Sequence, residues 1–93
     1  MKKEERKIIQ RQHMDKLVEY LPVLRSAARI TQNQLAKRLD IARSTVVVIE
    51  HRQRQLQWHM YLALVCIFTQ NEDSKKLLES FELFDKEFLN KIL

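Results

Sequence analysis

Apolar residues recur at spacings of three and four along most of the chain, a pattern typical of helices that bury one face. The pattern is weak over residues 4–20, where polar residues dominate, and clear over residues 58–68. It continues to the end of the chain in a stripe of Leu77, Phe81, Phe84, Phe88 and Ile92. We therefore expect an all-α fold of four to six helices around one core.

Two local signals divide the first half of the chain. Because proline lacks an N–H and suits the first turn of a helix, Pro22 predicts a new helix over about residues 22–28. A single kinked helix is the alternative. Thr31, followed three residues later by Gln34, matches a capping box and predicts a helix over about residues 32–39.

A second short helix, about Arg43–His51, is expected after a gap of about three residues. Such a pair is typical of a helix-turn-helix, whose second helix enters the DNA major groove. At 100° per residue, Val46 and Ile49 share the face expected to turn inward, which leaves Val47 and Val48 exposed. Exposed valines fit thymine methyl groups in the major groove, and a protein contact is the alternative.

The stretch from about residue 17 to residue 69 resembles the Cro and phage-repressor type of helix-turn-helix, the XRE family of bacterial transcriptional regulators. The matching residues are Leu24, Arg25, Thr31, Gln32, Leu35, Ala36, Leu39, Ile41, Ser44, Thr45, Val46, Ile49 and Glu50. The resemblance implies a phage-repressor-like fold. It also implies an ion pair between Arg25 and Glu50, which in the family often joins the first and third helices.

The resemblance further implies which residues meet DNA. Gln32 matches a family glutamine that contacts phosphate and supports the residues that read bases. The positions that read or flank bases are Arg43, Ser44, Thr45, Val47 and Val48. The positions that contact the backbone are Arg52 and Arg54, and His51 is a further candidate on the same exposed face. An arginine at the start of such a helix typically binds guanine with two hydrogen bonds.

The chain departs from the family pattern at its helix ends. It contains no glycine, and it lacks the usual capping residue before the recognition helix. The turn glycine is replaced by Asp40, which tolerates the left-handed conformation better than most residues. The position that usually caps the recognition helix is Ala42, a change that costs about 1 kcal/mol. A glycine after the family glutamate is replaced by Arg52, so an extension of the recognition helix to Gln53 is one expectation.

Composition and charge exclude several other functions. Without glycine there is no phosphate-binding loop or dinucleotide fingerprint, and the residues show no catalytic set, so no enzyme and no cofactor are expected. His13, His51 and His59 lack the spacing of metal ligands, so no metal is expected. The single cysteine, Cys66, is expected to be a small buried residue rather than a redox sensor. Charged residues follow Met1 and no long apolar run is present, so we expect a cytoplasmic location.

The net charge of +5 is uneven, with +3 over residues 1–16, +4 over residues 17–70 and −2 over residues 71–93. The basic body suggests an anionic partner such as double-stranded DNA. One domain is expected over residues 1–93, with a basic extension (1–16), a helix-turn-helix core (17–69) and a C-terminal helical segment (71–93).

The two ends of the chain have two interpretations each. The extension is expected to be a solvated helix that packs through Ile8 and Ile9, with a basic arm on DNA as the alternative. The apolar stripe over residues 77–93 is expected to join two copies as a homodimer. The alternative is that the stripe folds back over the helix at residues 58–68 within one chain.

The predicted function is therefore a sequence-specific DNA-binding transcriptional regulator, of the repressor kind. One alternative is an antitoxin, which would repress its own operon and hold a toxin as a protein partner. Another is a protein-interaction module that has kept the fold and lost DNA binding.

Overall fold

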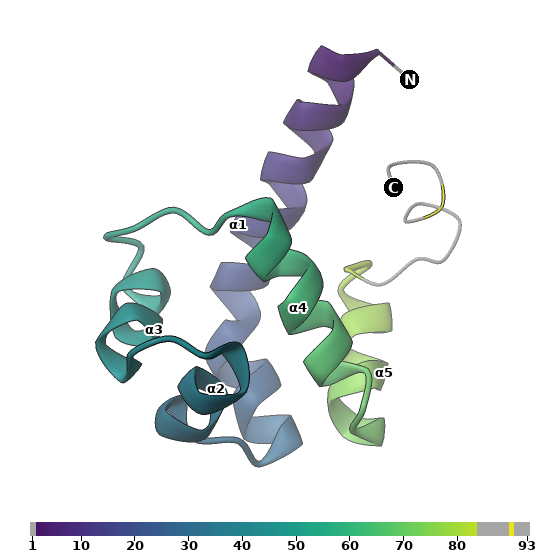
Figure 1. The fold of residues 1–93 in the computed structure, drawn as a ribbon. Coiled ribbons are helices and arrows are strands. Elements are labelled where there is room, and N and C mark those ends of the chain that lie inside the picture. Colours follow the sequence, from purple (N-terminus) through teal and green to yellow (C-terminus); the bar gives the residue numbers. More distant parts are fainter. Residues whose placement is uncertain (1, 84–89, 91–93) are drawn as a thin grey trace.

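The computed structural model describes residues 2–83 and residue 90 (Figure 1). These residues form α1 (Lys3–Ala28), α2 (Gln32–Leu39), α3 (Arg43–Glu50), α4 (Trp58–Phe68) and α5 (Glu72–Ser80). Helix α1 contacts α3, α4 and α5, and α2 packs against α3 and α4. The N-terminal half of α1 projects beyond the other helices (Figure 1). The prediction of a small all-α domain is confirmed.

The core lies between α1, α4 and the two short helices. Leu17 and Leu24 of α1, Leu35 of α2, and Leu64 and Phe68 of α4 are fully or almost fully buried within it. Burial of each such side chain contributes about 1.5–3 kcal/mol of hydrophobic free energy. This core fixes α2 and α3 against α1, which is what positions the site described below.

Helix α1 is continuous, so the single-helix alternative is right and a separate helix after Pro22 is wrong. Pro22 removes one helical hydrogen bond, but its side chain is exposed. Leu21 and Leu24 stay buried on the opposite side and hold both parts of the helix to the core. The expectation that Ile8 packs inward is also wrong, because Ile8 is 60% exposed.

Four helix ends are closed by residues in the left-handed conformation, and none of the four is glycine. They are Arg29, Asp40, Arg52 and Glu82, with φ between 56° and 60°. At each end the N–H groups of the left-handed residue and of the residue after it bond back to helix carbonyls, which is the Schellman arrangement. The predicted extension of α3 to Gln53 is therefore wrong, because the Gln53 N–H bonds to the Val48 carbonyl at 2.9 Å.

The predicted capping box at the start of α2 is present. The Thr31 hydroxyl accepts a hydrogen bond from the Gln34 N–H at 3.1 Å, and the Gln34 side chain accepts one from the Thr31 N–H at 2.9 Å. Helix α3 has no such cap, because Ala42 stands at that position. The N–H groups of the first turn of α3 therefore have no side-chain cap.

The C-terminal stripe does not form one continuous helix, because α5 ends at Ser80. Leu78 and Leu83 are buried in the core of the same chain, and the Tyr61 hydroxyl donates to the Leu83 carbonyl at 2.8 Å. Leu78 and Leu83 therefore pack back on their own chain and present no surface to a second copy, whereas Leu77 and Phe81 are half-buried. The homodimer through residues 77–93 stays a prediction. Phe84, Phe88 and Ile92 lie outside the described residues.

The prediction that Cys66 is buried is wrong, because its side chain is exposed. The buried face of α4 carries Tyr61, Leu64, Val65 and Phe68. At 100° per residue Cys66 points away from that face.

Candidate functional site

Helices α2 and α3 are joined by three residues and pack against each other, in the order expected of a helix-turn-helix. The outer side of α3 presents Arg43, Ser44 and His51, whose side chains are exposed. Val47 and Val48 flank this side and are half-buried rather than fully exposed. Neither valine belongs to the hydrophobic core. Five of the residues expected to meet DNA therefore lie together on one helix face.

Arg25 and Glu50 form an ion pair between α1 and α3. The Arg25 Nε donates to Glu50 Oε2 at 2.7 Å, and a second guanidinium nitrogen donates to Oε1 at 3.1 Å. The two side chains are only 17% and 6% exposed. A further Arg25 nitrogen donates to the Ile30 carbonyl at 3.3 Å. A bidentate contact between arginine and a carboxylate is among the strongest hydrogen-bonded pairs in proteins. It holds α1 and α3 in a fixed relative orientation.

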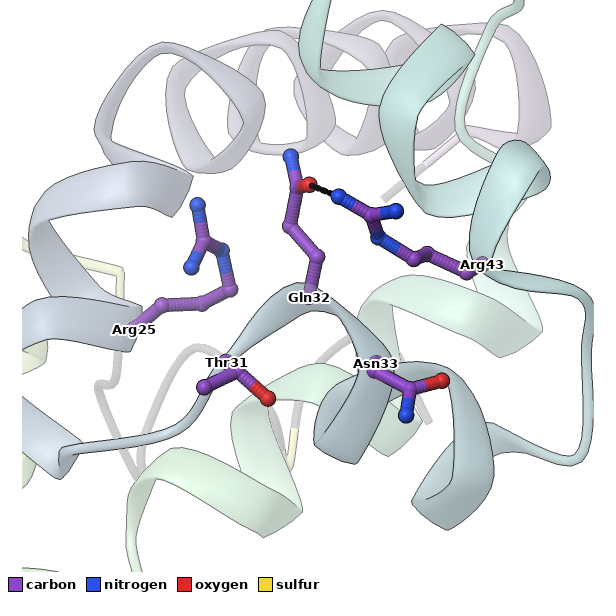
Figure 2. Close-up of a pocket in the computed structure, with 5 residues that line it drawn as sticks. All are labelled: Arg25, Thr31, Gln32, Asn33 and Arg43. Atoms are coloured by element: carbon purple, nitrogen blue, oxygen red, sulfur yellow. Dashed lines mark hydrogen bonds between the residues drawn. The ribbon is translucent and has the colours of Figure 1, made fainter.

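Gln32 extends this pair to α2 and to the start of α3. Its Nε2 donates to Glu50 Oε1 at 2.9 Å, and its Oε1 accepts from Arg43 Nη2 at 3.4 Å. Because the amide nitrogen is used by Glu50, the amide oxygen is turned toward Arg43. Residues of three helices thus form one chain of donors and acceptors, of which Figure 2 shows the contact between Gln32 and Arg43. The family resemblance implied that Gln32 contacts phosphate and supports the residues that read bases, and it gave no sign of the contact with Glu50.

Three of these residues, Arg25, Gln32 and Arg43, line an open hollow of about 830 Å³ at the start of α2, which Thr31 and Asn33 complete (Figure 2). Arg25, Gln32 and Arg43 converge on it from three helices. The first turns of α2 and α3 contain no acidic residue. Because the Arg25 charge is paired with Glu50, the positive ends of both helix dipoles and the exposed Arg43 are what favour an anion in this hollow.

The remaining expected residues lie elsewhere. Thr45 is half-buried on the side of α3 that faces the loop before α4, where it lines a separate hollow of about 280 Å³ with Arg54 and Leu56. Arg52 and Arg54 are exposed on that loop, beyond the end of α3. The structure thus separates Thr45 from the outer face of α3. It places Arg52 and Arg54 beside that face rather than on it.

The His51 ring has a defined orientation. Its Nδ1 lies 2.9 Å from the Val47 carbonyl oxygen, which can only accept, so Nδ1 carries a proton. The other ring nitrogen, Nε2, is left to bind a partner. In the neutral ring Nε2 is an acceptor, and in the charged ring it is a donor.

Three further features bear on other functions: groups of metal ligands, membrane-spanning helices and titratable side chains. Over residues 2–83 and 90, no three His, Cys, Asp or Glu side chains gather where they could hold a metal ion. In this range no helix is long and apolar enough to cross a membrane. Burial raises the pKa of Tyr61 from 10.0 to about 12, but this hydroxyl is bound to the Leu83 carbonyl and ties the core together.

No protein-family model matches the chain, and comparisons with curated proteins and with solved structures likewise find no match. The function therefore has to be inferred from the geometry of the chain itself.

Proposed function

We propose that this protein is a sequence-specific DNA-binding regulator of transcription, which places α3 in the major groove. One observation carries the proposal: the network of Arg25, Gln32, Glu50 and Arg43 fixes α2 and α3 to α1. It does so while the outer side of α3 stays open to a partner. A partly buried polar network of this kind makes the helix pair rigid, which base reading requires.

Base reading is assigned to the outer side of α3. Arg43 is held to Gln32 by a long contact of 3.4 Å, so little is lost when its guanidinium turns to O6 and N7 of a guanine. Ser44 suits either donors or acceptors on bases. Val47 and Val48 provide apolar contact for thymine methyl groups.

Backbone contacts are assigned to the ends of this face. The hollow at the start of α2 accepts one phosphate beside Thr31, Gln32 and Asn33, where the first N–H groups of α2 and its helix dipole favour an anion. Arg52 and Arg54 contact the backbone on the other side of the reading helix. Contacts of this class hold the protein in register and carry no sequence information.

One such helix reads only a few base pairs, so two copies acting on a two-fold symmetric site are part of the proposal. Leu78 and Leu83 are not part of the joining surface, because they are buried in the core of their own chain. A regulator of this kind works in the cytoplasm, which is the location we propose.

Selection of bound duplexes from a random DNA pool tests the proposal and returns the site. We expect one enriched motif. On that motif, Arg43→Ala should cost about 1–3 kcal/mol and relax the preference at one base pair. Arg54→Ala should weaken binding to all duplexes about equally, and Lys76→Ala on α5 is the control for loss of one charge. The absence of any enriched motif, with no binding of the pool itself, would overturn the proposal.

A further inference from the structure

The projecting half of α1 meets the loop that follows α3. Arg11 Nη1 donates to the Leu56 carbonyl at 3.0 Å, which joins the two segments. Lys7 and Lys3 lie four and eight residues before Arg11, and residues four apart on a helix are neighbours on its surface. Both lysines are exposed. A row of three cations, spaced about 6 Å apart along the axis, therefore leads away from the loop.

Two arginines of the loop continue this row. Arg52 and Arg54 are exposed and line a hollow of about 280 Å³ together with Asp15 and Val18 of α1. Their side chains therefore border α1 on the side where Arg11 meets the loop. We call the five residues Lys3, Lys7, Arg11, Arg52 and Arg54 the basic strip.

Acidic residues near the strip are fewer than its cations. Asp15 lies 3.8 Å from Arg11 and is 69% exposed, so its pairing is weak. Glu4 is three residues before Lys7 on the same helix. Two carboxylates against five cations leave the strip positive.

The N-terminal half of α1 contributes almost no side chains to the core of the domain. Among the described residues, α1 buries no side chain before Met14, and Ile8 is exposed. A helical segment with so little burial gains little stability from tertiary contacts. Lys3 and Lys7 are instead exposed to a partner, while Arg11 ties this half of the helix to the loop that follows α3.

We propose that the basic strip binds the phosphate backbone of duplex DNA flanking the base pairs read by α3. The inference rests on the proposed function and extends it. A row of cations along a rigid helix suits a ligand that carries regularly spaced phosphates. The strip acts on affinity and on salt dependence and not on the choice of base.

The test compares two double variants that remove the same charge. Lys3→Gln with Lys7→Gln takes two cations from the strip, and Lys75→Gln with Lys76→Gln takes two from α5. Binding to one long duplex is followed by fluorescence anisotropy over a range of salt concentrations. Each phosphate contact contributes about 0.9 to the slope of log K against log salt, so the strip variant should lower the slope by about 1.8. The α5 variant should keep the slope of the unmodified protein.

The outcomes separate this inference from the proposed function. If the unmodified protein binds duplex DNA but the strip variant keeps its slope, the strip does not contact DNA. An equal decrease in both variants would assign the effect to net charge and likewise overturn the inference. If the unmodified protein binds no duplex at all, the proposed function and this inference are both wrong. Both lysines are exposed, so unchanged thermal unfolding is expected for the strip variant.

Discussion

Removal of the Glu50 carboxylate should destabilise the protein far more than loss of a surface ion pair. Glu50→Ala leaves Arg25 without its partner at a site where the arginine side chain is only 17% exposed. Breaking a buried pair on one side costs about 3–5 kcal/mol, because one charge stays behind. The partial exposure of Arg25 favours the lower value, about 3 kcal/mol. For a chain of 93 residues this corresponds to a decrease in Tm of roughly 12–24 °C.

The double variant Arg25→Met, Glu50→Leu separates loss of the pair from the stranded charge. It removes both charges and keeps apolar volume, so we expect a stability within about 1 kcal/mol of the unmodified protein. Asp15→Ala is the matched control, because it breaks an exposed ion pair of 3.8 Å with Arg11. That change should cost less than about 1 kcal/mol.

Thermal and urea unfolding followed by circular dichroism measure all three variants. A cost for Glu50→Ala equal to that for Asp15→Ala would contradict the argument from burial. A double variant less stable than the Glu50→Ala single variant would contradict the argument from the stranded charge.

Three further predictions concern the helix ends, the buried tyrosine and the reading helix. Glu82→Gly should raise the free energy of unfolding by about 0.5–1 kcal/mol, because Glu82 has a φ of 59° that glycine adopts without strain. Glu79→Gly, within α5, should lower the free energy of unfolding by about 1 kcal/mol, and chemical denaturation of the two variants should therefore give changes of opposite sign. The folded state holds the Tyr61 proton more tightly than the unfolded state does, because burial raises the pKa of this hydroxyl from 10.0 to about 12. The free energy of unfolding should therefore fall by about 2–3 kcal/mol as the pH rises through this range. Tyr61→Phe should remove that part of the pH dependence in urea titrations. Gln32→Ala removes the 2.9 Å contact that ties α2 to Glu50 and should weaken binding to the selected DNA motif, while Asn33→Ala, on the same turn of α2, should weaken it less in the same anisotropy titration.

The helix-turn-helix could be predicted from the sequence because its signals are local. The capping box of Thr31 and Gln34 depends on four consecutive residues, and it fixed the start of α2 at Gln32. The contact between Arg25 and Glu50 joins two distant positions, and only the resemblance to a family predicted it. The same resemblance could not show that Gln32 links Glu50 to Arg43, since that depends on side-chain orientation.

The sequence predictions that the structure contradicts concern positions where tertiary contacts decide the path of the backbone. The sequence of α1 contains Pro22, yet buried leucines on both sides keep the helix whole. The end of α3 follows from a left-handed Arg52, a conformation that a chain without glycine gives no reason to expect. The stripe from Leu77 onward is helical in spacing, but its path turns at Glu82, so that Leu83 reaches Tyr61.

The central claim is that this domain binds duplex DNA through α3, and a salt titration tests it most directly. Anisotropy of a labelled duplex carrying the selected motif is measured with the unmodified protein over increasing salt. If about six phosphates are contacted, log K should fall against log salt with a slope of about −5, and Arg43→Ala should bind the motif about 1–3 kcal/mol more weakly than the unmodified protein. No binding at low salt, or binding that does not change with salt, would contradict the account.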